Sequence, residues 1–424
     1  MTPPSFSKPA WGVDLFTQGD TAYEFFMDLG PGRLGERILL ARPRTPRGYK
    51  GCVVLKCLPT PLGADASGRF QRARARLEEE ARLAKYLQHP RIARVHGLVE
   101  LEQGLCVMME RVEGLTLNTL LSVAQVRGRY FSESFILYVG AETAAALAHA
   151  HTRTDEAGVP LGIVNRDIHP GRIRLGPRGE VWLTDFGLAL SRLTGRVATS
   201  FPRAQGEVLY AAPEALRGEA VDASSDLFSL GLTLLEFATG RHLYDPGHLL
   251  AEQVEAQLSQ EEREKVLAAS VASLDLELPS FAEDALRCAM AFRSEDVEHA
   301  ARGLSVPLRD ILHTLLRHDP AERFATAAEL ERVLRARLAQ LEPYAEQEAL
   351  REVQQALADV GDDAWDIEVP GDEGGISPPL TEEQAREPLQ FEVRPRYKPR
   401  RPPDEVTTAP GDKTQHAVRR TPTV

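Results

Sequence analysis

The sequence predicts a mixed α+β protein in which a small strand-rich part precedes a larger helical part. From about residue 23 to 111, β-branched runs such as 52–55 alternate with glycine turns and flank one charged helix at 70–87. From residue 115 onward, apolar side chains recur at helical spacing, as in 132–149 and 227–239. The chain has 424 residues, of which 43% are hydrophobic and 26% charged. Such a composition is typical of a soluble chain with more than one compact part.

These patterns divide the chain into consecutive segments. We expect an N-terminal extension at 1–22, a first lobe at 23–112, a second lobe at 113–340, an additional amphipathic helix at 341–360 and a tail at 361–424. Within the second lobe, residues 245–306 are acidic and longer than a simple connection needs, which predicts a helical insertion on the surface.

The two C-terminal segments differ in composition. After Pro343, the residues Leu350, Val353, Leu357 and Val360 fall on one face of a helix, which we expect to pack on the body. The tail is rich in proline, glycine and charge, and it changes from acidic to basic along its length. This composition cannot bury a core, so we expect the tail to be disordered.

Charge, hydropathy and cysteine content indicate which kinds of partner and location the protein has. The net charge of −12 argues against a dedicated nucleic-acid surface. No apolar run approaches the roughly 20 residues that cross a bilayer, and residues 1–11 lack the pattern of a signal peptide. We therefore expect a cytoplasmic protein with no membrane partner. Four cysteines fit neither a metal pair nor a disulfide framework and are assigned no chemistry: Cys52, Cys57, Cys106 and Cys288.

The first lobe contains three features that could bind phosphate. Residues 30–35 read Gly-Pro-Gly-Arg-Leu-Gly, and glycines let a backbone turn bring its N–H groups close to phosphates. Alone, this pattern is also typical of a plain hairpin turn. Lys56 follows on a strand and Glu80 on the charged helix, so that a carboxylate is available to hold the ammonium. Each could otherwise be an ordinary surface residue.

The second lobe carries an ordered series of further motifs. Residues 165–172 read Asn-Arg-Asp-Ile-His-Pro-Gly-Arg, 185–187 read Asp-Phe-Gly and 212–214 read Ala-Pro-Glu. Asp226 follows in a helical stretch, and Arg323 follows an Asp-Pro turn. Over about 23–338, this series resembles Ser/Thr protein kinases of the bacterial, eukaryotic-like type. The resemblance implies a bilobal protein-kinase fold, and it implies ATP and Mg²⁺ as cofactors.

The resemblance also implies roles for individual residues. Lys56, Glu80, Asp167 and His169 match catalytic positions, and Asp185 matches the metal ligand. Nucleotide-binding positions are matched by Gly30, Gly32, Gly35, Lys56, Glu110 and Val112.

Several of these positions depart from the family pattern. The catalytic-loop lysine is replaced by His169, and the asparagine that holds the second magnesium is replaced by Arg172. A guanidinium has no lone pair for a metal and brings its own charge, so it excludes that ligand and could instead pair with Asp185. The threonine before Ala-Pro-Glu is Glu207, whose carboxylate could bind His169 or Arg172. The loop histidine is Asn165.

The adenine site departs as well. Its floor would be Arg174, and its roof would be Val54 together with Arg37, or with Ile38 if one residue is inserted. Arginine can stack on an adenine face, so nucleotide binding is weakened but not excluded.

Two functions are compatible with a site in which some family residues are retained and others are substituted. The substitutions favour a pseudokinase with weak or no phosphotransfer that acts as a scaffold or regulator of protein partners. The alternative is an active Ser/Thr kinase with protein substrates, favoured by the presence of Lys56, Glu80, Asp167 and Asp185. The identity of the partners or substrates does not follow from the sequence.

Overall fold

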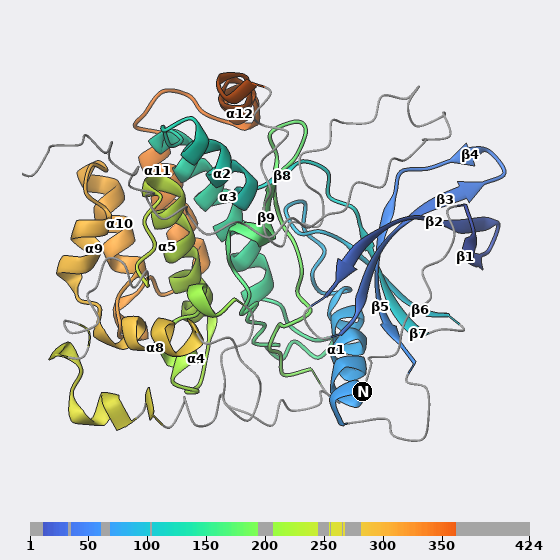
Figure 1. Ribbon diagram of the computed structural model, residues 1–424, viewed down its shortest axis with the longest axis horizontal. Coiled ribbons are helices and arrows are strands. Elements are labelled where there is room, and N and C mark those ends of the chain that lie inside the picture. The colour runs from blue at the N-terminus through green and yellow to red at the C-terminus, as the bar shows by residue number, and fades with distance from the viewer. Residues whose placement is uncertain are drawn as a thin grey trace, which may run out of the picture. The chain divides into compact units, whose positions relative to one another are not determined.

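A computed structural model describes residues 12–32, 35–60, 68–101, 104–193, 207–244, 254, 256–264, 266–267 and 281–361. Within this part, a strand-rich lobe is followed by a helical lobe, which confirms the α+β class and the bilobal protein-kinase fold (Figure 1). The expected disordered tail lies outside the described residues. No helix in the described ranges is long and apolar enough to cross a membrane.

The first lobe contains an antiparallel sheet with the strand order β1-β2-β3-β5-β7-β6, in which β4 pairs with β3. The strands are β1 (Asp14–Gln18), β2 (Thr21–Pro31), β3 (Arg37–Thr45), β4 (Gly48–Tyr49), β5 (Val53–Pro59), β6 (Val95–Leu101) and β7 (Gly104–Glu110). The strand β1 lies in the segment expected to be an extension, so the sheet begins earlier than the sequence predicts. Gly19, with φ of 63°, provides the tight turn into β2.

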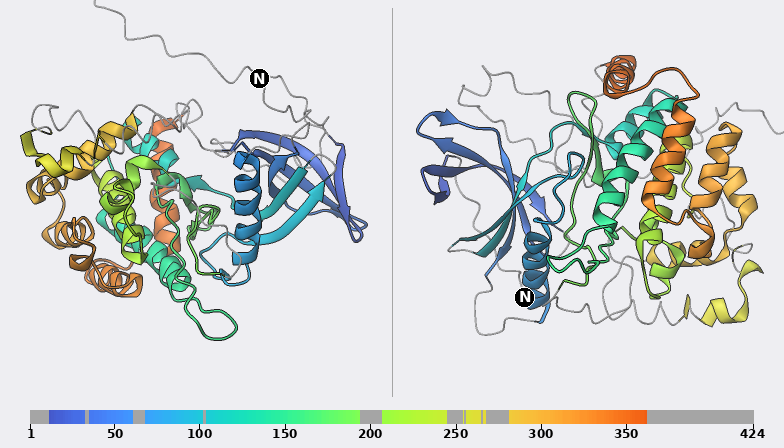
Figure 2. Two further views of the ribbon diagram at one scale, coloured as in Figure 1. Left: turned by 90° about the horizontal axis from the view of Figure 1, so that it is seen from below. Right: turned by 180° about the vertical axis from the view of Figure 1, so that it is seen from behind.

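The two faces of this sheet carry separate apolar clusters. One cluster contains Leu39 and Leu55, and the other contains Val107 together with Leu77 of the helix α1 (Gly68–Leu83). Figure 2 shows α1 against one face of the sheet. Successive side chains of a strand point to opposite faces, so Lys56, next to Leu55, points toward the α1 side.

A disulfide joins Cys57 to Cys106 within the first cluster. The expectation that the cysteines have no chemistry was therefore wrong for this pair. The two residues are direct cross-strand neighbours on β5 and β7, but 49 positions separate them in the sequence. The pairing follows from strand register, which cysteine spacing alone does not reveal.

The second lobe is built mainly from helices around one large apolar cluster. Its elements are β8 (Leu115–Thr116), α2 (Leu117–Val126), α3 (Glu133–His151), η1 (Pro170–Arg172), β9 (Ile173–Leu175), β10 (Val181–Leu183), η2 (Val208–Tyr210), α4 (Pro213–Leu216), α5 (Ala223–Thr239), α8 (Phe281–Ala291), α9 (Ser294–Ala300), α10 (Val306–Leu315), η3 (Pro320–Glu322), α11 (Ala327–Leu338) and α12 (Glu346–Val360). Ser132 begins α3 by accepting the backbone N–H of Phe135. Gly240 ends α5 in a left-handed conformation.

Two expectations about the second lobe have different outcomes. The region 245–306 is not simply a surface insertion, because in its described part Leu286, Phe292 and Val297 belong to the large core cluster. Acidic residues between the apolar ones obscure this packing in the sequence. Within the segment 341–360 expected to form an amphipathic helix, the helix α12 covers Glu346–Val360, and its Val353 and Val360 are buried against the body.

Candidate active site

The first group of site residues lies between β5, α1 and the segment after β10. Lys56 Nζ lies 3.1 Å from Glu80 Oε2 and 3.0 Å from Asp185 Oδ1. The expected pairing of Lys56 with Glu80 is confirmed, and Asp185 joins it. Gly187 permits this close approach, because a Cβ there would lie 2.8 Å from Glu80 Oε2 and 3.0 Å from Lys56 Nζ.

Burial and neighbouring charge set the protonation of these groups. Burial alone would lower the pKa of Lys56, but the charges of Asp185 and Glu80 outweigh it and raise the pKa. Burial would raise the pKa of Asp185, yet Lys56 and Arg172 hold it well below its usual range. For Glu80, burial prevails over the attraction to Lys56 and raises the pKa to about 7. Glu80 can therefore change charge near neutral pH.

The loop 165–172 is held by Asp226 from α5, as the sequence predicts. The fully buried carboxylate of Asp226 accepts the backbone N–H of Asn165 at 2.7 Å and of Arg166 at 2.8 Å. It also lies 2.8 Å from His151 Nε2. Arg166 has φ of 66°, a conformation that costs free energy in a residue other than glycine. The buried carboxylate stabilises this strained turn.

Asp167 and Asp185 are bridged by Arg172. Arg172 Nε lies 2.8 Å from Asp167 Oδ2, and its Nη1 lies 3.1 Å from Asp185 Oδ2. Pairing with Asp185 was expected, and the contact with Asp167 is an addition. His169 Nε2 lies 3.7 Å from Asp167 Oδ1. Five of the predicted residues, including Lys56 and Glu80, thus form one connected group of charges, with His169 at its border.

The glycine turn joins β2 to β3 beside this group. Gly30 and Gly35 have φ of 110° and 90°, which favour glycine. The backbone N–H of Gly32 donates to Glu36 O at 2.7 Å, and a Cβ on Gly32 would lie 2.6 Å from Cγ of Glu36. Ile38 of β3 stands directly opposite Lys56 of β5. The register therefore brings the end of this turn next to Lys56.

Strand register separates the two residues that the sequence offered as candidates for an adenine roof, Arg37 and Ile38. Ile38 pairs with Lys56, and Leu40 pairs with Val54. Because directly opposed residues point to the same face, Ile38 shares the face of Lys56 and Val54, whereas Arg37 points away. Arg37 instead pairs with Asp28 on β2.

The remaining residues that the sequence predicts to contact a nucleotide lie near the connection between the lobes. Glu110 is the last residue of β7, and its carboxylate accepts the backbone N–H of Arg94 at 3.1 Å. Val112 follows it, before β8. Arg174 of β9 donates from Nη2 to Gly114 O at 3.3 Å.

Two contacts at the site were missed from the sequence. Ser191 Oγ donates to Glu79 Oε1 at 2.6 Å, which ties α1 to the segment after Asp-Phe-Gly. The backbone N–H of Glu207 donates to Asp167 Oδ1 at 2.9 Å. The sequence does not single out Glu79, because it is one of three consecutive glutamates. The contact of Glu207 uses its backbone N–H, which every residue except proline has, so it cannot be predicted from the residue type.

The carboxylates of this site do not fit a magnesium pair. The first expected metal ligand, Asp185, contacts two cationic side chains, Lys56 and Arg172. The second expected ligand position, an asparagine in the family, is occupied by Arg172 itself. Among the described residues, no group of three or more His, Cys, Asp or Glu side chains could hold a metal. Magnesium prefers oxygen ligands in octahedral geometry, which a guanidinium cannot supply.

A buried ion pair links the Ala-Pro-Glu segment to the helical lobe. Arg323 Nη1 lies 2.7 Å from Glu214 Oε1, and Nη2 lies 2.9 Å from Oε2. The sequence predicts this pair, and the structure confirms it.

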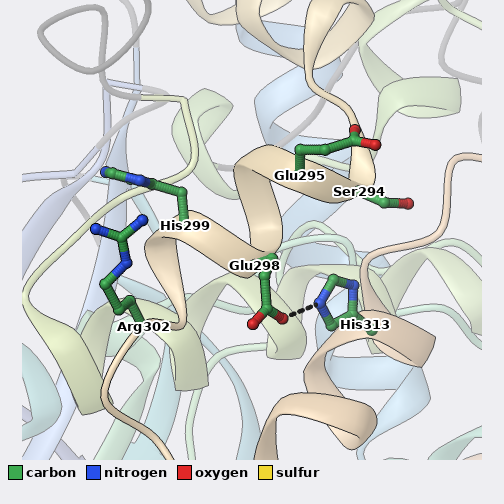
Figure 3. Close-up of a pocket in the computed structure, with 6 residues that line it drawn as sticks. All are labelled: Ser294, Glu295, Glu298, His299, Arg302 and His313. Atoms are coloured by element: carbon green, nitrogen blue, oxygen red, sulfur yellow. Dashed lines mark hydrogen bonds and ion pairs between the residues drawn. The ribbon is translucent and has the colours of Figure 1, made fainter.

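A separate pocket of about 420 Å³ lies on the second lobe (Figure 3). It is lined by Ser294, Glu295, Glu298, His299, Arg302 and His313. Within it, Glu298 pairs with His313 at 3.0 Å. None of the residues of the charge group around Lys56 lines this pocket, so it is not part of the candidate active site.

Comparison with known proteins identifies the family to which this sequence is similar. The sequence model of the protein kinase domain matches residues 23–334. The tyrosine-protein kinase MasK of Myxococcus xanthus is 32% identical over 322 residues, which cover 74% of this chain and 46% of MasK. The Ser/Thr-protein kinase PknJ of Mycobacterium tuberculosis is 33% identical over 223 residues, covering 52% of this chain and 34% of PknJ.

A third relative is the Ser/Thr-protein kinase PrkC of Bacillus subtilis, which is 33% identical over 170 residues, covering 40% of this chain and 24% of PrkC. The matched parts thus span less than half the length of these relatives. The family match covers both lobes and all the motifs described above. The chain therefore belongs to the protein kinase family, of the bacterial Ser/Thr type.

Proposed function

We propose that this chain is a Ser/Thr-type signalling protein with weak or no phosphotransfer, which acts as a scaffold or regulator of protein partners. The family generally transfers a phosphate from Mg²⁺-bound ATP to a protein hydroxyl. The observation that carries the proposal is the bridge from Arg172 to both Asp167 and Asp185. It occupies the carboxylates on which transfer depends.

Three substitutions act together at this position. Asp167 would orient and accept from the substrate hydroxyl, but one of its oxygens binds Arg172. His169 replaces a permanent cation with one that titrates. Glu207 adds a negative charge where the family pattern has threonine. Loss of one electrostatic contact to the transition state costs about 10²–10³ in rate, so the combined effect exceeds that.

A slow but true kinase is the second candidate. It is favoured by the contact of Lys56 with both Glu80 and Asp185, because this arrangement serves to position nucleotide phosphates. Under this alternative, Asp167 remains the catalytic base after Arg172 moves aside.

Transfer of labelled phosphate from ATP to the chain itself and to a generic basic substrate separates the candidates. We expect no sustained incorporation above that of Asp185→Asn. The triple variant Arg172→Asn, His169→Lys and Glu207→Thr should raise incorporation, whereas the exposed Arg178→Asn should not. Incorporation by the native chain that Asp185→Asn abolishes would establish an active kinase, and phosphoamino-acid analysis would then identify the hydroxyl type.

The proposal also includes the boundaries of the lobes, the location of the protein in the cell, its cofactors and its nucleotide contacts. We place the lobes at 23–112 and 113–340 and the protein in the cytoplasm, with no membrane or nucleic-acid partner. Weakened binding of ATP and Mg²⁺ follows from Arg172 and Arg174. Nucleotide contacts are assigned to the glycine turn, Lys56 and the connection at Glu110 and Val112.

A further inference from the structure

The candidate active site already contains a cation between its two acidic residues. Arg172 contacts Asp167 through Nε at 2.8 Å and Asp185 through Nη1 at 3.1 Å. Two facing carboxylates commonly share a divalent metal ion. Here the guanidinium takes that position, and a metal ion bound to the same oxygens would have to displace it.

The formal charges of the group nearly balance without a metal. Lys56 and Arg172 supply two positive charges, and Asp167 and Asp185 supply two negative ones. Glu80 adds a further negative charge only in part at neutral pH, because burial raises its pKa to about 7. A divalent ion would add two positive charges to a group that has almost none to neutralise.

We propose that Arg172 replaces the divalent cation, so that this site binds the phosphates of a nucleoside triphosphate without Mg²⁺. This inference rests on the proposed loss of phosphotransfer and extends it to the ligand. A guanidinium binds phosphate oxygens in a planar, two-point geometry, and its charge does not depend on pH. Lys56, whose Nζ lies 3.0 Å from Asp185 on the same side of the group, supplies the second positive charge for the phosphates.

The physical consequence is an inverted metal dependence. In the family pattern, Mg²⁺ bridges the acidic residues and the phosphates, so that chelating the metal weakens binding. In this chain, ATP should bind through Lys56 and Arg172, and Mg²⁺ should compete with Arg172 for the oxygens of Asp167 and Asp185. Chelation should therefore leave the affinity unchanged or increase it.

The test is to measure melting temperature and the Kd of a fluorescent ATP analogue, each with EDTA and with excess Mg²⁺. A ligand that binds only the folded state raises the melting temperature, so both readouts are independent of turnover. For the native chain, we expect binding in EDTA with a Kd no higher than in Mg²⁺. Arg172→Asn should make binding in EDTA at least about tenfold weaker than in Mg²⁺, because the carboxylates then require a metal.

Matched variants define the site. Lys56→Met should weaken binding in both conditions, while Arg178→Asn, which removes an exposed arginine, should not. Binding by the native chain only when Mg²⁺ is present would overturn the inference, and so would no binding in either condition. These comparisons on the native chain decide the matter even if Arg172→Asn fails to fold. Phosphate transfer in the labelling assay would refute the proposed function separately, since it is read from a different product.

Discussion

Replacing Arg323 with alanine is expected to destabilise the helical lobe by about 3–5 kcal/mol, the usual cost of breaking a buried pair from one side. The side chain of Arg323 is 0% exposed and that of Glu214 is 3% exposed. Arg323 also donates to the backbone carbonyls of Arg317 at 2.8 Å, Ser224 at 3.2 Å and His318 at 3.1 Å. Alanine removes all of these donors at once.

The larger part of this cost comes from the carboxylate left behind. Burial would raise the pKa of Glu214, but its contacts with Arg323 hold it below the usual value. In the native chain, this pair contributes stability above the ordinary pKa of glutamate, and the contribution is lost as the pH falls. In Arg323→Ala, burial still raises the pKa of Glu214, opposed by the 2.7 Å hydrogen bond from Ser225 and a backbone hydrogen bond at Glu214. The difference between variant and native chain should therefore shrink below about pH 5.

Urea unfolding and thermal melting at pH 7.5 provide the measurement. At about 2 °C per kcal/mol for a chain of this size, we expect the melting temperature to fall by about 6–10 °C. Arg287→Ala is the control, because Arg287 forms a surface pair with Asp284 at 3.3 Å and its loss should cost no more than about 0.5 kcal/mol. A loss below 1 kcal/mol for Arg323→Ala, or one equal at pH 4.5 and 7.5, would refute the reasoning.

Three further outcomes are expected. Peptide mapping without reductant should recover Cys57 linked to Cys106, and the double alanine variant should unfold up to about 4 kcal/mol more easily, since the link closes a loop of 49 residues; recovery of unlinked peptides only would contradict this. Val353→Asp should cost about 2–4 kcal/mol by placing a charge in the contact of α12 with the body, whereas the exposed Gln354→Asp should be near neutral by the same urea titration. Because the folded-state pKa of Glu80 is raised to about 7, its contribution to stability is present below about pH 4.5 and is lost as the pH rises through 7. The melting temperature should therefore fall from pH 5 to 8 more in the native chain than in Glu80→Gln, and equal slopes would show that Glu80 does not titrate there.

Much of the site could be predicted because its residues belong to short motifs with fixed local geometry. Lys56 could be placed on a strand and paired with Glu80 of the following helix, because the motif series of the family joins these two residues. Asp226 and the loop at 165–172 could be linked by the motif series of the family. The incompatibility of Arg172 with a metal ligand follows from side-chain chemistry alone, because a guanidinium has no lone pair to donate.

Other features depended on which strands and helices meet. The sequence left Arg37 and Ile38 as alternatives for the adenine roof, and only the register of β3 with β5 placed Ile38 beside Lys56. The acidic pattern of 245–306 hid the contribution of Phe292 to the core, because charged residues on the outer face of a helix obscure the buried ones.

The sequence by itself determined the class of fold, the order of the motifs and the presence of an arginine where a metal ligand is expected. These depend on residue identity and on periodicity over one element, which are local. Only the tertiary structure decided that Arg172 spans Asp167 and Asp185 and that Cys57 meets Cys106. Such contacts join residues far apart in the chain, and their geometry is set by strand register and helix packing rather than by any nearby pattern.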